Sequence, residues 1–218
     1  MKSHKKIITF TFIFIIGSLS NIYSIGIIET FFKFPIEILY QITPDQKKKG
    51  LQLYYEKQPA IINSRYNTPI EITKVDTIGN FLCFKTSDVS STEIKVIRAD
   101  SGQSYIFHNS ITCGPACDSN ITIFNDEWYY VPTEKAAPSL LKLSKLDFFD
   151  LEKAKEDGKN IEELIEKLTP LFYELHFSAE KNDLIVRLDI SRLDGETKEA
   201  LKPYFTETKT FSWTGSRF

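Results

Sequence analysis

The hydrophobic and polar positions along the chain follow a helical period first, a strand period in the middle and both at the end. The segment Ile27–Lys57 predicts helix, since Leu51, Tyr54 and Tyr55 recur at the i, i+3, i+4 spacing of an apolar stripe. Pro59 predicts the end of this helix, because the residue before a proline avoids the α region.

The same segment contains a signal for a helix start. Thr43 is suited to the N-cap position, Pro44 to the first turn and Gln46 to the closing position of a capping box. The basic run Lys47–Lys49 follows on the predicted helix, and we interpret it as a solvent-exposed face.

The period changes to two between Ile70 and Val131, which is typical of strands. Five short runs are rich in β-branched and aromatic residues, and turn-forming residues separate them. The runs are Ile70–Val75, Phe81–Thr86, Thr92–Arg98, Gln103–Thr112 and Asn120–Phe124. Because no helical segment separates these strands, the pattern predicts an antiparallel meander.

The C-terminal part combines helical and strand periods. It predicts helical turns in Leu140–Phe149, a helix capped by Asn160, a hairpin of Leu171–Ser178 with Leu184–Ile190, a helix around Glu196–Lys202 and a last strand around Thr206–Trp213. The fold class is therefore predicted as α+β: a central antiparallel β-meander, helices packed on one face, and a C-terminal hairpin–helix–strand unit. That unit either extends the same sheet or forms a second one. We expect a single domain over residues 27–218, with a subdivision into 27–131 and 138–218 as the alternative.

The N-terminus has the features of a secretory signal peptide. A basic head of three lysines precedes the uncharged run Ile7–Gly17, and small polar residues follow. The run is shorter than the roughly 20 apolar residues that a membrane-spanning helix needs. We predict a signal peptide over residues 1–24 with cleavage after Ser24; cleavage after Ser20 and an uncleaved anchor are the alternatives.

The net charge limits the classes of molecule that this chain is expected to bind. Removal of residues 1–24 takes away three lysines and no acid, which changes the formal net charge from −2 to −5. A mildly acidic chain argues against nucleic acid and against adhesion to an anionic membrane. We expect export to the periplasm, the extracellular space or the cell envelope, with no membrane span after processing and a protein or small molecule as partner.

The run Cys113-Gly-Pro-Ala-Cys117 is the strongest candidate for chemistry. Redox enzymes of the Cys-x-x-Cys type place the first cysteine at a helix N-terminus, which lowers its pKa. Here three residues separate the sulfurs, a turn and a strand follow, and the negative charge of Asp118 would raise a thiol pKa. A Cys113–Cys117 disulfide that staples a turn is the preferred interpretation; a bridge involving Cys83, or no bridge, is the alternative.

The two histidines that remain after processing do not form a recognisable site. Neither His108 nor His176 has a further ligand at metal-binding spacing in the sequence. The spacing of His108 and Cys113 in an extended strand predicts opposite faces, which argues against a Cys–His pair. No phosphate-binding, dinucleotide-binding or hydrolase motif is present in the sequence, so we assign no catalytic, cofactor-binding or metal residue and expect no cofactor.

The segment "TCGPACDSNITIFNDEWYYVP" and the closing "ETKEALKPYFTETKTFSWTGSRF" resemble a family of exported Bacteroidales proteins catalogued as domain of unknown function 3256. The most specific part of the likeness is Cys-Gly-Pro-x-x-Asp-Ser followed by a strand and a Trp. Its residues here are Cys113, Gly114, Pro115, Asp118, Ser119 and Trp128. The resemblance implies a bacterial envelope protein and supplies no activity, substrate or catalytic residue.

These observations favour a non-catalytic binding or structural module of the cell envelope over an enzyme. Two other functions remain as hypotheses. One is a thiol-dependent redox protein centred on Cys113 and Cys117. The other is an inhibitor or partner-binding domain that uses an exposed sheet face.

Overall fold

The structure is a computed structural model that describes residues 25–39 and 41–218. The predicted signal peptide, residues 1–24, lies outside the described residues. None of the helices in the described part of the chain combines the length and the apolar character that a membrane span requires.

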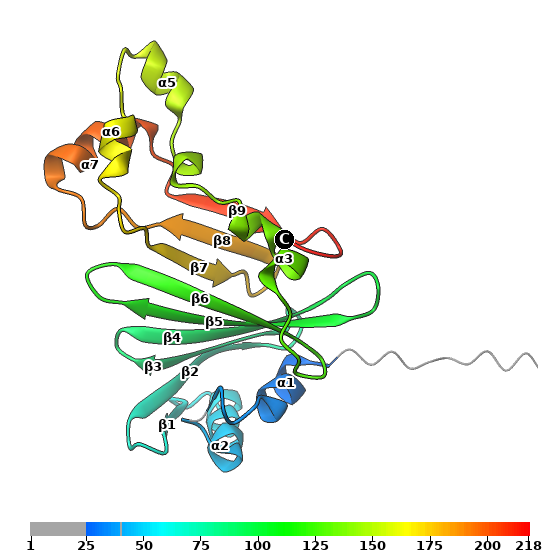
Figure 1. Cartoon of the computed structure of the whole chain (residues 1–218). Helices are drawn as coiled ribbons and strands as arrows, with labels where there is room; N and C mark the ends of the chain where they lie inside the picture. The colour runs from blue at the N-terminus through cyan, green and yellow to red at the C-terminus, as the bar shows by residue number, and fades with distance from the viewer. Residues whose placement is uncertain (1–24, 40) are drawn as a thin grey trace, which may run out of the picture.

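Six antiparallel strands form the first sheet, in the order in which they occur in the sequence (Figure 1). They are β1 (Ile61–Asn63), β2 (Pro69–Asp76), β3 (Phe81–Ser87), β4 (Ser90–Arg98), β5 (Ser104–Cys113) and β6 (Cys117–Asn125). The predicted meander is confirmed. The short strand β1 was not predicted, because three residues carry too little of the alternating period to be recognised.

The predicted N-terminal helix is wrong as one continuous element. The structure has two helices, α1 (Ile27–Lys33) and α2 (Pro44–Tyr55), and a non-helical connection between them. The break begins at Phe34, whose ψ of 126° is extended because Pro35 follows it. The predicted start of α2 is confirmed: the Thr43 hydroxyl accepts a hydrogen bond from the Gln46 N–H, and the Gln46 side chain accepts one from the Thr43 N–H at 2.7 Å.

Helices α1 and α2 cover one face of the first sheet (Figure 1). Strands β2 to β6 present the alternate residues of their period to the helices, so the two layers share a buried apolar core. Its largest fully buried members are Phe31, Phe84, Ile27, Ile70, Leu82, Ile94 and Ile106. Gly50 of α2 permits a close approach here, because a Cβ at this position would lie 2.8 Å from the side chain of Ile72.

Lys47 corrects the interpretation of the basic run as a solvent-exposed face. Lys48 and Lys49 are exposed, but Lys47 is only 3% exposed. Its Nζ donates hydrogen bonds to the carbonyl oxygens of Phe34 at 3.2 Å and Phe32 at 3.5 Å, where α1 ends. Burial lowers the pKa of Lys47 to about 8. The lysine therefore satisfies carbonyl groups that the end of a helix leaves without partners.

The C-terminal part forms a second antiparallel sheet, which lies on the opposite face of the first (Figure 1). Its strands are β7 (Tyr173–Phe177), β8 (Asp183–Leu188) and β9 (Thr208–Ser212), and α7 (Gly195–Leu201) connects the last two. The predicted hairpin–helix–strand unit is confirmed, and it forms a second sheet rather than extending the first. Aromatic rings join the layers: Phe107 of β5 lies 5.3 Å from Phe177 and 5.4 Å from Phe218 between ring centroids.

Short helices connect the two sheets. They are α3 (Thr133–Ala136), α4 (Pro138–Leu141), a 3₁₀ turn (Lys145–Phe148), α5 (Leu151–Glu156) and α6 (Glu162–Glu166); a second 3₁₀ turn, Lys202–Tyr204, follows α7. Helix α5 was not predicted. The side chain of Asn160 accepts a hydrogen bond from the N–H of Glu162 at 3.2 Å, but α6 has Ile161 as its N-cap, so the predicted cap lies one residue too early.

The capping box of α2 predicts a stability change. Thr43→Ala removes the hydroxyl that caps α2 and should lower the free energy of unfolding by about 1 kcal/mol. Urea unfolding of both proteins measures the difference. The matched control is Thr206→Ala, because the Thr206 hydroxyl makes no hydrogen bond to the described part of the chain. Equal midpoints for the two variants would contradict the capping role.

Candidate functional site

Strand β7 is an edge strand of the second sheet, and its free edge faces the first sheet. The residues of β7 that hydrogen-bond to β8 alternate with those that do not, and the Ser178 N–H, just after β7, donates to the Asp183 carbonyl of β8. The N–H groups of Tyr173, Leu175 and Phe177 therefore point away from β8. A buried backbone N–H without a partner costs about as much as a lost hydrogen bond. The chain must therefore supply partners for this edge from elsewhere.

Side chains of the first sheet are those partners. The Leu175 N–H donates to Ser119 Oγ at 2.9 Å, and the Phe177 N–H donates to Glu93 Oε2 at 2.9 Å. The Leu175 carbonyl accepts from Asn109 Nδ2 at 2.6 Å. Asp118 accepts from the N–H of Tyr173 at 3.4 Å. We call this set of side chains the polar junction; it comprises Glu93, Lys95, Asn109, Asp118 and Ser119.

Lys95 completes the polar junction at the β7–β8 turn. Its Nζ donates to the carbonyl oxygens of Ser178 at 3.0 Å, Ala179 at 3.3 Å and Gly79 at 2.7 Å. Burial lowers the pKa of Lys95 to about 8. Gly79 is required at this contact, because a Cβ there would lie 1.7 Å from the Ala179 carbonyl oxygen.

His176 of β7 lies between two carboxylates next to the polar junction. Its Nδ1 is 2.7 Å from Glu93 Oε1, and its Nε2 is 3.1 Å from Glu174 Oε1. Glu174 also pairs with Arg187 of β8, with Nη1 and Oε2 2.7 Å apart. The hydrogen bond to Glu93 is the main cause that raises the pKa of His176 to about 9, and Glu174 adds to it. His176 is therefore a cation at neutral pH that joins β7 to β4.

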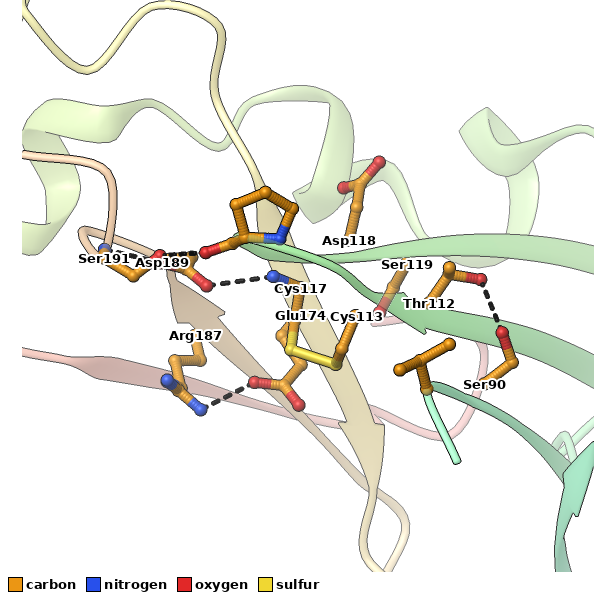
Figure 2. Close-up of a disulfide and its surroundings, with 12 residues drawn as sticks. Ser90, Thr112, Cys113, Cys117, Asp118, Ser119, Glu174, Arg187, Asp189 and Ser191 are labelled. Atoms are coloured by element: carbon orange, nitrogen blue, oxygen red, sulfur yellow. Dashed lines mark hydrogen bonds and ion pairs between the residues drawn. A yellow bond between two sulfur atoms is a disulfide. The ribbon is translucent and has the colours of Figure 1, made fainter. Parts of the chain in front are cut away.

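The predicted disulfide between Cys113 and Cys117 is confirmed. The two cysteines pair in register at the β5–β6 turn, and a second set of bonds fixes this turn to the end of β8 (Figure 2). The Cys117 N–H donates to Asp189 Oδ2 at 2.9 Å, and Ser191 Oγ donates to the Pro115 carbonyl at 2.8 Å. Burial alone would raise the pKa of Asp189, but the hydrogen bonds from Ser191 and Cys117 keep it below its usual value.

The alternative bridge involving Cys83 is not formed. Cys83 is a half-buried free thiol on β3, in register with Glu93 of β4. Burial raises the pKa of this thiol, which disfavours the reactive thiolate form.

Glu174 lies beside the disulfide (Figure 2), and its carboxylate and the two sulfurs lie within 4.8 Å of one another. Cysteine binds metal ions as a thiolate, and a disulfide offers none. Glu174 is also already paired with Arg187 and His176. A small hollow of about 130 Å³ adjoins this group, with Cys113, Glu174 and His176 in its wall. In this state the arrangement links the two sheets and offers no thiolate as a metal ligand or a nucleophile.

His108 lies on the helix-covered face of β5, together with its near neighbour Ile106. Cys113 lies with Glu174 on the face toward the second sheet. The prediction that the two residues would not form a Cys–His pair is therefore confirmed. Burial lowers the pKa of His108 to about 4, and its ring centroid is 5.3 Å from that of Phe34.

The polar junction was missed at the level of sequence. Glu93 and Lys95 occur in "TEIKVIR", where their alternation with Ile and Val is also typical of a strand with one solvent-exposed face. The informative signal was position: β4 lies in the middle of the meander, where charged side chains toward a second layer need partners.

The geometry defines an α+β protein in which two antiparallel sheets stack through a polar junction and a disulfide fixes the turn beside it. A family model described as "Protein of unknown function (DUF3256)" matches residues 20–218, so the chain belongs to this family. A domain of an uncharacterized protein from Porphyromonas gingivalis W83 has a similar structure, with a TM-score of 0.71 and 19% sequence identity over 88% of this chain and 98% of that domain. No curated protein matches the sequence.

The position of His176 predicts a pH dependence of stability. Its pKa is about 9 in the folded protein against a usual value of 6.5, so its stabilising contribution is complete below the lower value and is lost as the pH rises through about 9. His176→Gln should therefore lower the free energy of unfolding more at about pH 6 than at about pH 10. Urea unfolding of both proteins at the two pH values measures this.

The difference between the two proteins is the quantity to compare, because Lys47 and Lys95 have lowered pKa values and give stability the opposite slope. Their contribution is common to both proteins and cancels. An equal effect of the substitution at both pH values would show that His176 gains nothing from its charge.

The disulfide closes a small loop and predicts a modest stabilisation. Replacement of both Cys113 and Cys117 by Ser should lower the free energy of unfolding by about 2 kcal/mol, the chain-entropy value for a loop of about five residues. Denaturant unfolding of the oxidised protein and of the double variant gives the difference, with Cys83→Ser as the matched control. A variant that no longer folds would contradict this magnitude, because the bonds from Asp189 and Ser191 hold the same turn.

Proposed function

We propose that this chain is an exported, non-catalytic binding module of the bacterial cell envelope, in which residues 27–218 act as one unit. The observation that carries the proposal is the state of Glu93. Its carboxylate accepts hydrogen bonds from Asn109, His176 and the Phe177 N–H, so both oxygens are already engaged within the protein, which argues against a role as a general base. The side chains best suited to acid–base chemistry are thus engaged in holding the two sheets together.

The disulfide supports the same proposal. Structural disulfides are typical of oxidising compartments such as the periplasm and the cell surface. Cys113 and Cys117 lie at a turn between two strands and not at the N-terminus of a helix, where a redox cysteine would obtain its lowered pKa. The geometry therefore favours a staple over the thiol-dependent alternative.

Export is the part of the proposal that a direct experiment can test. Expression of the full chain with a C-terminal tag in a Bacteroidales host should give a product in the envelope or medium whose N-terminus follows Ser24 or Ser20, as N-terminal sequencing would show. Thiol labelling without reductant should modify only Cys83, because Cys113 and Cys117 are joined in the disulfide.

The matched control places a charge in the predicted apolar run: Ile13→Arg should retain the full-length chain in the cytoplasm. A full-length product in the cytoplasm of the wild-type strain, with all three cysteines reactive, would refute the export proposal.

A further inference from the structure

A cavity of about 190 Å³ lies between the α1–α2 connection and the helix-covered face of the first sheet. The connection supplies an apolar wall that includes Leu39 and Ile42, both buried, and β3 adds the ring of Phe84. This cavity lies on the opposite face of the sheet from the polar junction and the disulfide.

The sheet also gives the cavity a polar floor. In register across three strands, Thr92 of β4 lies opposite Phe84 of β3 and Ser110 of β5. His108, two residues before Ser110, lies on the same face, and Thr86 of β3 also lines the cavity. Four polar side chains thus replace the apolar residues that occupy this face of the sheet further along the strands.

Two of these side chains face the cavity and make no hydrogen bond to any described residue. Thr92 is 6% exposed, and its hydroxyl makes no hydrogen bond to any described residue. The ring nitrogens of His108, which is half-buried, likewise have no hydrogen-bond partner in the described part of the chain. Polar groups that line a cavity in this way are normally satisfied by water or by a ligand.

The cavity carries no charge. None of the described residues that line it is Asp, Glu, Lys or Arg, and burial lowers the pKa of His108 to about 4, so the imidazole is neutral at physiological pH. A charged ligand would lose its hydration here without gaining a counter-ion. The imidazole and the hydroxyl groups can each donate or accept a hydrogen bond.

We propose that this cavity binds a small neutral molecule that has an apolar body and at least one N–H or O–H group. The apolar body packs against Leu39, Ile42 and Phe84, and the polar group bonds the hydroxyl of Thr92, with His108 beside it. The cavity equals about six water volumes and is smaller than the roughly 300–1,000 Å³ pockets of drug-sized ligands, which limits the ligand to one or two small rings or a short chain. The inference rests on the proposed binding function and adds its ligand class.

Indole and indene are the probes that test this, because they share a fused-ring shape and only indole carries an N–H. Each is titrated into the ¹⁵N-labelled mature chain and followed by NMR. Indole should bind with a Kd on the order of 1 mM or tighter, with shifts centred on the amides of β3, β4 and β5 near Thr92 and His108. Indene should bind about tenfold more weakly, because it cannot form the hydrogen bond.

Two variants separate the cavity from the rest of the surface. Thr92→Val keeps the shape of the side chain and removes its hydroxyl, and it should weaken the binding of indole about tenfold. Ser110→Phe places a ring into the cavity from an exposed position and should abolish binding. Thr210→Val on β9 is the control and should change nothing. Unchanged thermal unfolding of each variant shows that it still folds.

Equal affinity for indole and indene would overturn the proposed polar recognition. No saturable binding of indole, or binding that Ser110→Phe leaves intact, would overturn the site itself and leave water as the occupant of the cavity. These outcomes do not depend on where the chain is located. A failure of export would therefore refute that part of the proposed function without changing the result for the cavity.

Discussion

The structure depends on hydrogen bonds between the side chains of one sheet and the backbone of another. Strand β7 lies with its free edge against the first sheet, and an edge of this kind needs a partner for every buried N–H and C=O. Glu93, Lys95 and Asn109 provide those partners from β4 and β5. The two sheets are thus joined without pairing their strands, and the aromatic core around Phe107 can fill the space between them.

Charged groups in an interior are costly unless they are paired or fully hydrogen-bonded, and the polar junction supplies partners to both of its buried charges. Glu93 faces the protonated His176, and Lys95 is surrounded by three carbonyl oxygens. The gain from such an arrangement is geometry more than stability, because the hydrogen bonds to Leu175, Phe177 and Ser178 fix the position of β7 against the first sheet. The residues of the chain that most resemble a catalytic group therefore serve to position the second sheet.

The sequence predicted the elements whose signals are local and missed those that depend on the third dimension. The meander, the Thr43 capping box, the terminal hairpin and the Cys113–Cys117 bond followed from alternation, turn residues and short spacing. The predicted N-terminal helix was too long, because Pro35 keeps Phe34 out of the helical conformation and ends α1. Lys47 was interpreted as solvent-exposed and Glu93 was not singled out, since sequence alone does not show that a helix end or a second layer covers them. The cavity beside His108 arises from a loop that returns over the sheet, and no periodicity predicts that.

The hydrogen bonds of Glu93 also constrain which substitutions are tolerated at this position and at the residues that it contacts. If this carboxylate were lost, the Phe177 N–H, the Asn109 amide and the His176 imidazolium would all lose an acceptor in one step. No single replacement elsewhere restores an acceptor to all three donors, so these positions are expected to change together. The disulfide is less restrictive, because Asp189 and Ser191 hold the same turn by other bonds and one loss leaves the other in place.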